Sequence, residues 1–197
     1  MSILQSGFAL LEQGILWLVL ITLLAGKRLD NLPQRKGVIG GLLVAVLVIP
    51  VNGLSLGAWL RSVIGDLSMM GMVVFADVAS RRIFSFRLVC QDVRQWVLRG
   101  IVLTGLMFYP LALGMSALDP YQWGYAPVVM GVALAGSAFW AWLNGARGLA
   151  LLLLLPVLAY HLQLLESRNL WDYLIDPVVF VYALVQAVVY PVARKKL

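Results

Sequence analysis

The sequence predicts an all-α membrane protein, a bundle of seven transmembrane helices with the N-terminus outside and the C-terminus in the cytoplasm. Composition is the first observation behind this fold class. The 197 residues are 62% hydrophobic and 12% charged, whereas soluble domains are roughly 45–50% apolar and 25% charged. The second observation is that apolar runs of near-spanning length recur along the whole chain. The polar segments between them are too short to bury a core of their own.

The placement of charge is the third observation. All but two of the 15 basic residues fall in alternate polar segments, namely 27–36, 80–99, 144–147 and the C-terminal tail. By the positive-inside rule these segments are cytoplasmic. The exceptions are Arg61 and Arg168. Removing one span would place basic clusters on both sides, so seven spans are favoured. Because the basic residues sit in loops, the net charge of +6 does not point to nucleic acid.

The first span is expected at about 3–25. No basic residue precedes its apolar run, which is atypical of a cleavable signal peptide, so we expect a retained span. The second is expected at about 37–60. Its apolar part before Pro50 rises only about 21 Å, against a hydrocarbon core of roughly 30 Å. A proline kink near the interface is favoured, and a broken helix with a binding position at Asn52 is the alternative.

The third span is expected at 67–79. In the following segment, 80–99, arginines alternate with apolar residues, which predicts an amphipathic helix on the inner leaflet. The remaining spans are expected at 100–118, 127–143, 148–165 and 177–193. Asp176 and Pro177 have the residue types of an N-cap and a first-turn proline for the last span.

An outer polar cap at 160–177 joins the last two spans and holds the only histidine. His161 is a candidate general base, with Glu166 or Asp172 as the carboxylate that orients it. Arg61 and Arg168 are candidate anion-binding groups. The favoured alternative is that these residues form a structural cap at the membrane interface.

Two acids lie inside predicted spans. Glu12 is a candidate functional group, because an ionisable residue in hydrocarbon costs several kcal/mol and is expected to face the bundle. If the first span instead begins at Phe8, Glu12 reaches water. Asp77 has Arg81 four residues on, the spacing of a helical ion pair.

Several classes of site are excluded by residue counts. The single cysteine, Cys90, excludes an internal disulfide. One histidine excludes a bis-histidine haem and a multi-histidine metal site. We therefore expect no metal and no cofactor.

Three functions remain open. The favoured one is a binding or scaffold subunit of an envelope lipid or glycoconjugate pathway in the inner membrane, working with membrane lipids and a larger membrane or envelope protein. The second is a small enzyme acting on a lipid headgroup or lipid-linked substrate at the outer face. The third is a lipid or solute transporter that uses Glu12 and the interrupted second span.

Overall fold

The computed structural model describes residues 3–25 and 34–194, with side chains as far as residue 189. Within this range the protein is all-α, with ten helices and 77% helical content. The predicted cytoplasmic segment 27–36 falls largely outside the described residues, as do Lys195 and Lys196. The chain divides into two compact units, which are described separately.

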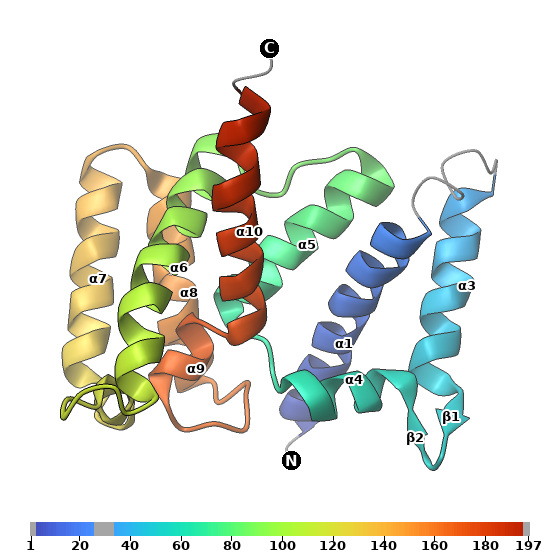
Figure 1. The fold of residues 1–197 in the computed structure, drawn as a ribbon, viewed down its shortest axis with the longest axis horizontal. Coiled ribbons are helices and arrows are strands. Elements are labelled where there is room, and N and C mark those ends of the chain that lie inside the picture. Colours follow the sequence, from blue (N-terminus) through green and yellow to red (C-terminus); the bar gives the residue numbers. More distant parts are fainter. Residues whose placement is uncertain (1–2, 26–33, 195–197) are drawn as a thin grey trace. The chain divides into compact units, whose positions relative to one another are not determined.

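The first unit contains the residues up to Asp66 together with Met72–Leu88. It holds α1 (Ile3–Leu24), α3 (Arg35–Val48), the strands β1 (Pro50–Val51) and β2 (Leu54–Ser55), α4 (Leu56–Ile64) and most of α5 (Met69–Phe84). Helix α1 packs against α3 and α4 (Figure 1). Apolar side chains on α1 and α3, among them Leu16, Val19 and Ile39, are buried.

The predicted second span is broken rather than kinked. Helix α3 ends at Val48, and an antiparallel hairpin pairs Pro50 with Ser55 and Val51 with Leu54. The two turn residues, Asn52 and Gly53, have φ of 51° and 85°. Positive φ at both central residues is the requirement of a type I′ turn, and Asn-Gly is its favoured sequence. The chain then re-enters helix at α4, which Ser55 caps by accepting a hydrogen bond from the backbone N–H of Ala58.

The predicted amphipathic helix at 80–99 does not form as one element. Helix α5 continues to Phe84, and the next helix begins only at Gln91. Ser85 adopts a φ of 55°, which ends the helix. The backbone N–H of Leu88 then donates to the Asp77 carboxylate at 3.0 Å. This contact folds the chain back along α5, so the arginines are distributed over two helix ends and a loop.

The second unit contains Leu67–Gly71 and Val89–Leu197. Its elements are α6 (Gln91–Ala112), the 3₁₀ helix η1 (Pro120–Tyr125), α7 (Val128–Leu143), α8 (Arg147–His161), α9 (Leu170–Leu174) and α10 (Pro177–Arg194). Helix α7 packs on α8 through a contact of small residues, Ala138, Ala141 and Ala150. Helix α6 packs on α10, where Gly105 leaves room for the ring of Phe180.

Seven longer helices (α1, α3, α5, α6, α7, α8 and α10) follow one another in the described chain in the order of the predicted spans. In the described residues, α1 alone is both long and apolar enough to cross a membrane by length and composition. Helices α7 and α8 and the Pro177–Val189 part of α10 are apolar but shorter.

Basic side chains at helix ends lie over aromatic rings. Arg99 lies 5.7 Å from the Trp96 ring centre, and Arg147 lies 5.7 Å from that of Trp142. These pairs belong to the first half of α6 and to the α7–α8 turn, which are neighbours because a side chain at Gly148 would touch Val93. The opposite end of this unit carries η1, α9 and the acidic residues of the predicted cap (Figure 1).

Candidate functional site

The predicted polar cap is a folded structure built between α8 and α10. Asn169 caps α9 by accepting from the backbone N–H of Trp171 at 2.9 Å. Its amide nitrogen donates to the carbonyl of Tyr121 in η1 at 2.9 Å, and the Trp171 indole donates to the carbonyl of Pro120 at 2.8 Å. At Gly124 a Cβ atom would lie 1.7 Å from the Asn169 side-chain oxygen. The two segments therefore meet at a position that admits only glycine.

Asp172 serves as the acceptor at the centre of this cap. The Tyr121 hydroxyl donates to its carboxylate at 3.0 Å, and the Ser167 hydroxyl donates to the same oxygen. Burial raises the pKa of Tyr121, and the nearby charge of Asp172 raises it further. The phenol thus keeps its proton, which it donates to Asp172.

Tyr173 fixes the loop that precedes α9. Its side chain is fully buried. Its hydroxyl accepts from the backbone N–H of Leu165 and lies 3.1 Å from the carbonyl of Ser167, to which it can donate. The loop from 162 to 169 is thereby tied to α9.

The candidate catalytic residues do not converge. His161 is exposed at the end of α8, where its ring meets that of Tyr160 with centres 5.8 Å apart. The hydrogen bonds described for Asp172 come from Tyr121 and Ser167. Glu166 is exposed, as is the candidate anion-binding residue Arg168. The structure therefore brings together Asp172, Ser167 and Tyr121, and leaves the histidine outside that group.

Asp176 lies where two helices begin, and it confirms the predicted N-cap. One carboxylate oxygen accepts from the backbone N–H of Val179 in α10 at 2.8 Å. The other accepts from the backbone N–H and the hydroxyl of Ser68, at 3.0 and 2.7 Å. Ser68 in turn accepts from the backbone N–H of Gly71 in the first turn of α5. Burial raises the pKa of Asp176, and the hydrogen bonds from Val179 and Ser68 oppose that rise.

In the first unit, Glu12 is covered by the protein and is only 3% exposed. Gln13 beside it packs on α4, because a Cβ at Gly57 would lie 2.5 Å from its amide oxygen. Asn52 is exposed in the hairpin turn. Arg61, the other candidate anion-binding residue, forms an ion pair with Asp66. The predicted pair of Asp77 and Arg81 is confirmed, with Oδ2 and Nε 2.8 Å apart.

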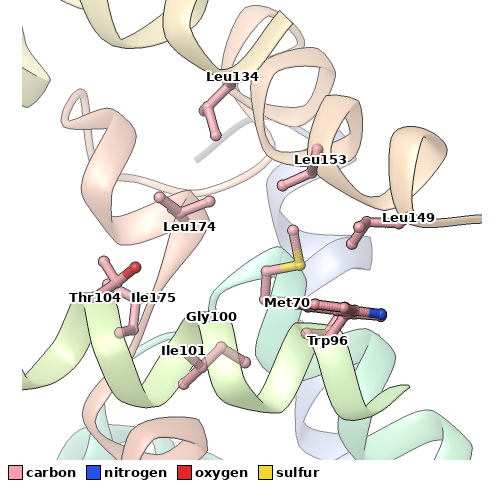
Figure 2. A pocket seen from close by; sticks show the side chains of 11 residues that line it. Met70, Trp96, Gly100, Ile101, Thr104, Leu134, Leu149, Leu153, Leu174 and Ile175 are labelled. Carbon is pink, nitrogen blue, oxygen red and sulfur yellow. The ribbon is translucent and has the colours of Figure 1, made fainter. Parts of the chain in front are cut away.

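A cavity of about 150 Å³ lies in the second unit beside α6 (Figure 2). None of the described residues that line it is charged. They are Met70, Trp96, Val97, Gly100, Ile101, Thr104, Leu134, Leu149, Leu153, Leu174 and Ile175. The α6 positions 97, 100, 101 and 104 have the spacing of one helix face. That spacing was readable in the sequence, but the facing residues from α7, α8 and α9 were not.

The predicted site residues did not include Ser68, Tyr121, Asn169 or Gly124, although all four take part in these contacts. A local signal exists for two of them. Asn169 is followed three residues later by Asp172, and Ser68 directly precedes an apolar run, both patterns typical of helix starts. Tyr121 and Gly124 act through contacts across the fold, which no local pattern indicates.

Comparison with protein-family models, with curated proteins and with solved structures found no match for this chain.

Proposed function

We propose that this chain is a seven-span protein of the inner membrane with its N-terminus outside, acting as a non-catalytic binding or scaffold subunit in an envelope lipid or glycoconjugate pathway. Its proposed partners are membrane lipids and a larger membrane or envelope protein. The observation that carries the proposal is the outward-facing apolar surface. On α7, which has no charged residue, Val129 is 81% exposed and Trp140 is 68% exposed. Such a continuous apolar face in a soluble monomer would favour aggregation, whereas lipid or a partner helix would cover it.

The distribution of charge supports the orientation. In the second unit, exposed Arg147 and, in the first half of α6, Arg99 lie toward one end together with Asp92. Asp119, Glu166 and Asp172 lie on or beside the cap at the other end, together with Arg168. Arginine over tryptophan at the cytoplasmic end is the arrangement expected at a lipid headgroup boundary.

The hydrogen bonds that the cap carboxylates accept from the protein support a non-catalytic role. Asp172 and Asp176 accept hydrogen bonds from the protein itself, and His161 lies apart from them. The described hydrogen bonds of these two carboxylates do not include His161, so neither of them orients it as a general base. We therefore expect His161→Ala to leave lipid and glycoconjugate turnover unchanged. A loss of turnover in folded protein would instead favour the enzyme alternative.

Cys90 allows the membrane placement to be tested directly. It is exposed and precedes α6 at the proposed cytoplasmic end. Carbonate-washed membranes should retain the protein. In intact cells a membrane-permeant maleimide should label Cys90 and an impermeant one should not. The matched control places the single cysteine at the other end, as Gln122→Cys in a Cys90→Ser background, and should react with both reagents. Extraction by carbonate, or the reverse labelling pattern, would contradict the proposed topology.

The subunit role has its own test. Purification in mild detergent, followed by mass spectrometry, should recover a larger membrane or envelope protein in fixed stoichiometry. A monodisperse chain that never co-purifies with another protein would oppose this part of the proposal while leaving the topology intact.

A transporter is the second candidate, favoured by the burial of Glu12 and the break after α3. Glu12 and Gln13 are buried polar side chains in a helix that is otherwise strongly apolar. An ionisable residue inside a membrane span is costly in free energy and is by default a candidate functional group. On this hypothesis, Glu12→Gln abolishes lipid or solute movement across reconstituted vesicles. Glu166→Gln, an exposed acid in the cap, is the control. Equal transport by wild type and Glu12→Gln would end this alternative.

A further inference from the structure

The cavity in the second unit has an uncharged, mostly apolar lining among the described residues, and one part of that lining faces outward. Trp96 is 60% exposed and Gly100 is exposed, while Ile101 and Ile175 are buried. Figure 2 shows Trp96, Gly100, Ile101 and Thr104 along α6, with Leu149 and Leu153 of α8 opposite. The lining is therefore open to the surface along the first half of α6, and it includes buried residues at and after the end of α9. Thr104 contributes the one hydroxyl of the lining.

Two arginines stand at the open end. The Arg99 guanidinium lies over the ring of Trp96, which itself lines the cavity. Arg147 begins α8 two residues before Leu149, another lining residue. A side chain at Gly148 would touch Val93 at 3.4 Å, which brings this helix start beside α6. Both arginines are exposed, so neither is buried in a structural ion pair.

We propose that this cavity receives a segment of one acyl chain of an anionic phospholipid from the inner leaflet, whose phosphate is bound by Arg99 and Arg147. This inference rests on the proposed membrane placement. An uncharged lining excludes a polar ligand from the interior, because burying a polar group without a partner is unfavourable. The guanidinium groups of Arg99 and Arg147, which stand beside this lining, would favour a phosphate over a neutral headgroup. The cytoplasmic leaflet is where anionic lipids and basic protein surfaces meet.

Filling the cavity is the first arm of the test. A Cβ at Gly100 would meet no atom within 4 Å, so Gly100→Leu should occupy the space without displacing its neighbours. Gly136→Leu on the exposed side of α7 is the matched control, since its Cβ also meets nothing. Lipids that remain with the purified full-length protein are then quantified against the bulk membrane. Wild type and Gly136→Leu should be enriched in anionic phospholipid, and Gly100→Leu should not.

Removing the headgroup contacts is the second arm, and it leaves the interior untouched. Arg99→Gln and Arg147→Gln should each weaken retention by about fivefold, the effect of one basic residue near an anionic surface. Arg87→Gln, in the exposed loop after α5, is the control and should retain wild-type lipid. The expected melting temperature of wild type is higher in zwitterionic micelles doped with phosphatidylglycerol than in undoped micelles. Gly100→Leu should lack this increment.

The outcomes separate this inference from the function on which it rests. If the protein is carbonate-resistant but Gly100→Leu retains the same lipids as wild type, the cavity proposal is wrong and the membrane placement stands. Enrichment of neutral lipid that Gly100→Leu abolishes would overturn the headgroup assignment. If wild type is extracted by carbonate, the membrane placement itself fails and the lipid proposal fails with it.

Discussion

Asp176 connects two helix starts through one carboxylate. Ser68 caps α5 and Asp176 caps α10, and the two caps are hydrogen-bonded to each other. The positive ends of two helix dipoles therefore meet at a group that carries negative charge when ionised. A Cβ at Gly71 would lie 2.3 Å from the carboxylate, so the approach is as close as the backbone permits.

Replacing Asp176 by alanine should destabilise the protein strongly. The change removes an N-cap and leaves the backbone N–H groups of Ser68 and Val179 buried without acceptors, at a cost of about 2–4 kcal/mol. Denaturant unfolding in detergent measures it. Glu166→Ala, an exposed acid on the same cap, is the control and should change the free energy of unfolding by less than about 0.5 kcal/mol. Similar values for the two variants would contradict the double-cap role.

The pH dependence of stability should carry the signature of Asp176. Because burial raises its pKa above the ordinary value of 3.8, the folded state holds the proton more tightly than the unfolded state does. The stabilisation by this group is therefore full below the ordinary pKa and is lost as pH rises through the folded pKa. Melting curves of wild type and Asp176→Asn from about pH 3 upward should differ in slope across that interval. Parallel curves would show that the hydrogen bonds cancel the effect of burial, and a slope difference of the opposite sign would show that they outweigh it.

Gly124 and Gly136 allow the same substitution to be compared at a crowded and at an open position. Gly124→Ala would place a methyl group against the Asn169 amide and should cost about 1–3 kcal/mol through overpacking. Gly136→Ala meets open space on α7 and should be neutral or stabilising by up to about 1 kcal/mol. Thermal melts of the two variants, taken side by side, make the comparison. Equal stability would mean that η1 and the α9 cap do not meet as described.

At the scale of elements, the sequence predicts the order of the long helices and some of their caps. Asp176-Pro177 is a local pattern, and the helix start at Pro177 confirms it.

The hairpin at 50–55 was missed although Asn52-Gly53 is its characteristic turn, because strands of two residues have no periodicity to detect. The segment 80–99 was mispredicted since its amphipathic pattern competes with a tertiary contact, the Asp77 carboxylate binding the backbone of Leu88.

The candidate site was less predictable than the helices. In the sequence, His161, Glu166 and Asp172 lie within one segment of twelve residues, and proximity in sequence suggested proximity in space. The cap instead uses Asp172 to bind Tyr121, which is 51 residues away. The choice between a catalytic and a structural acid thus depended on a long-range partner that the sequence does not reveal.

At the scale of the whole molecule, we expect α1 to remain part of the mature protein rather than to be cleaved off. Helix α1 packs against α3 and α4, and Gln13 fills the space over Gly57. Cleavage near Ala25, as for a signal peptide, would expose Ile39 and the rest of the α3 contact surface. Intact mass measurement of the membrane-extracted protein should therefore include residues 3–25. A mass that begins after α1 would contradict both the retained span and the first unit as described.

The hydrogen bond from Ser68 to Asp176 spans 108 residues, and this separation orders the events of biosynthesis. At 5–20 residues per second, the ribosome adds the acceptor about 5–20 s after the donor. During that interval the start of α5 lacks its final cap, and α6, α7 and α8 are made and positioned around it. The last helix to be synthesised therefore completes the first turn of one made much earlier. Chains that terminate before Asp176 should accumulate as a less stable species that quality-control proteases can recognise.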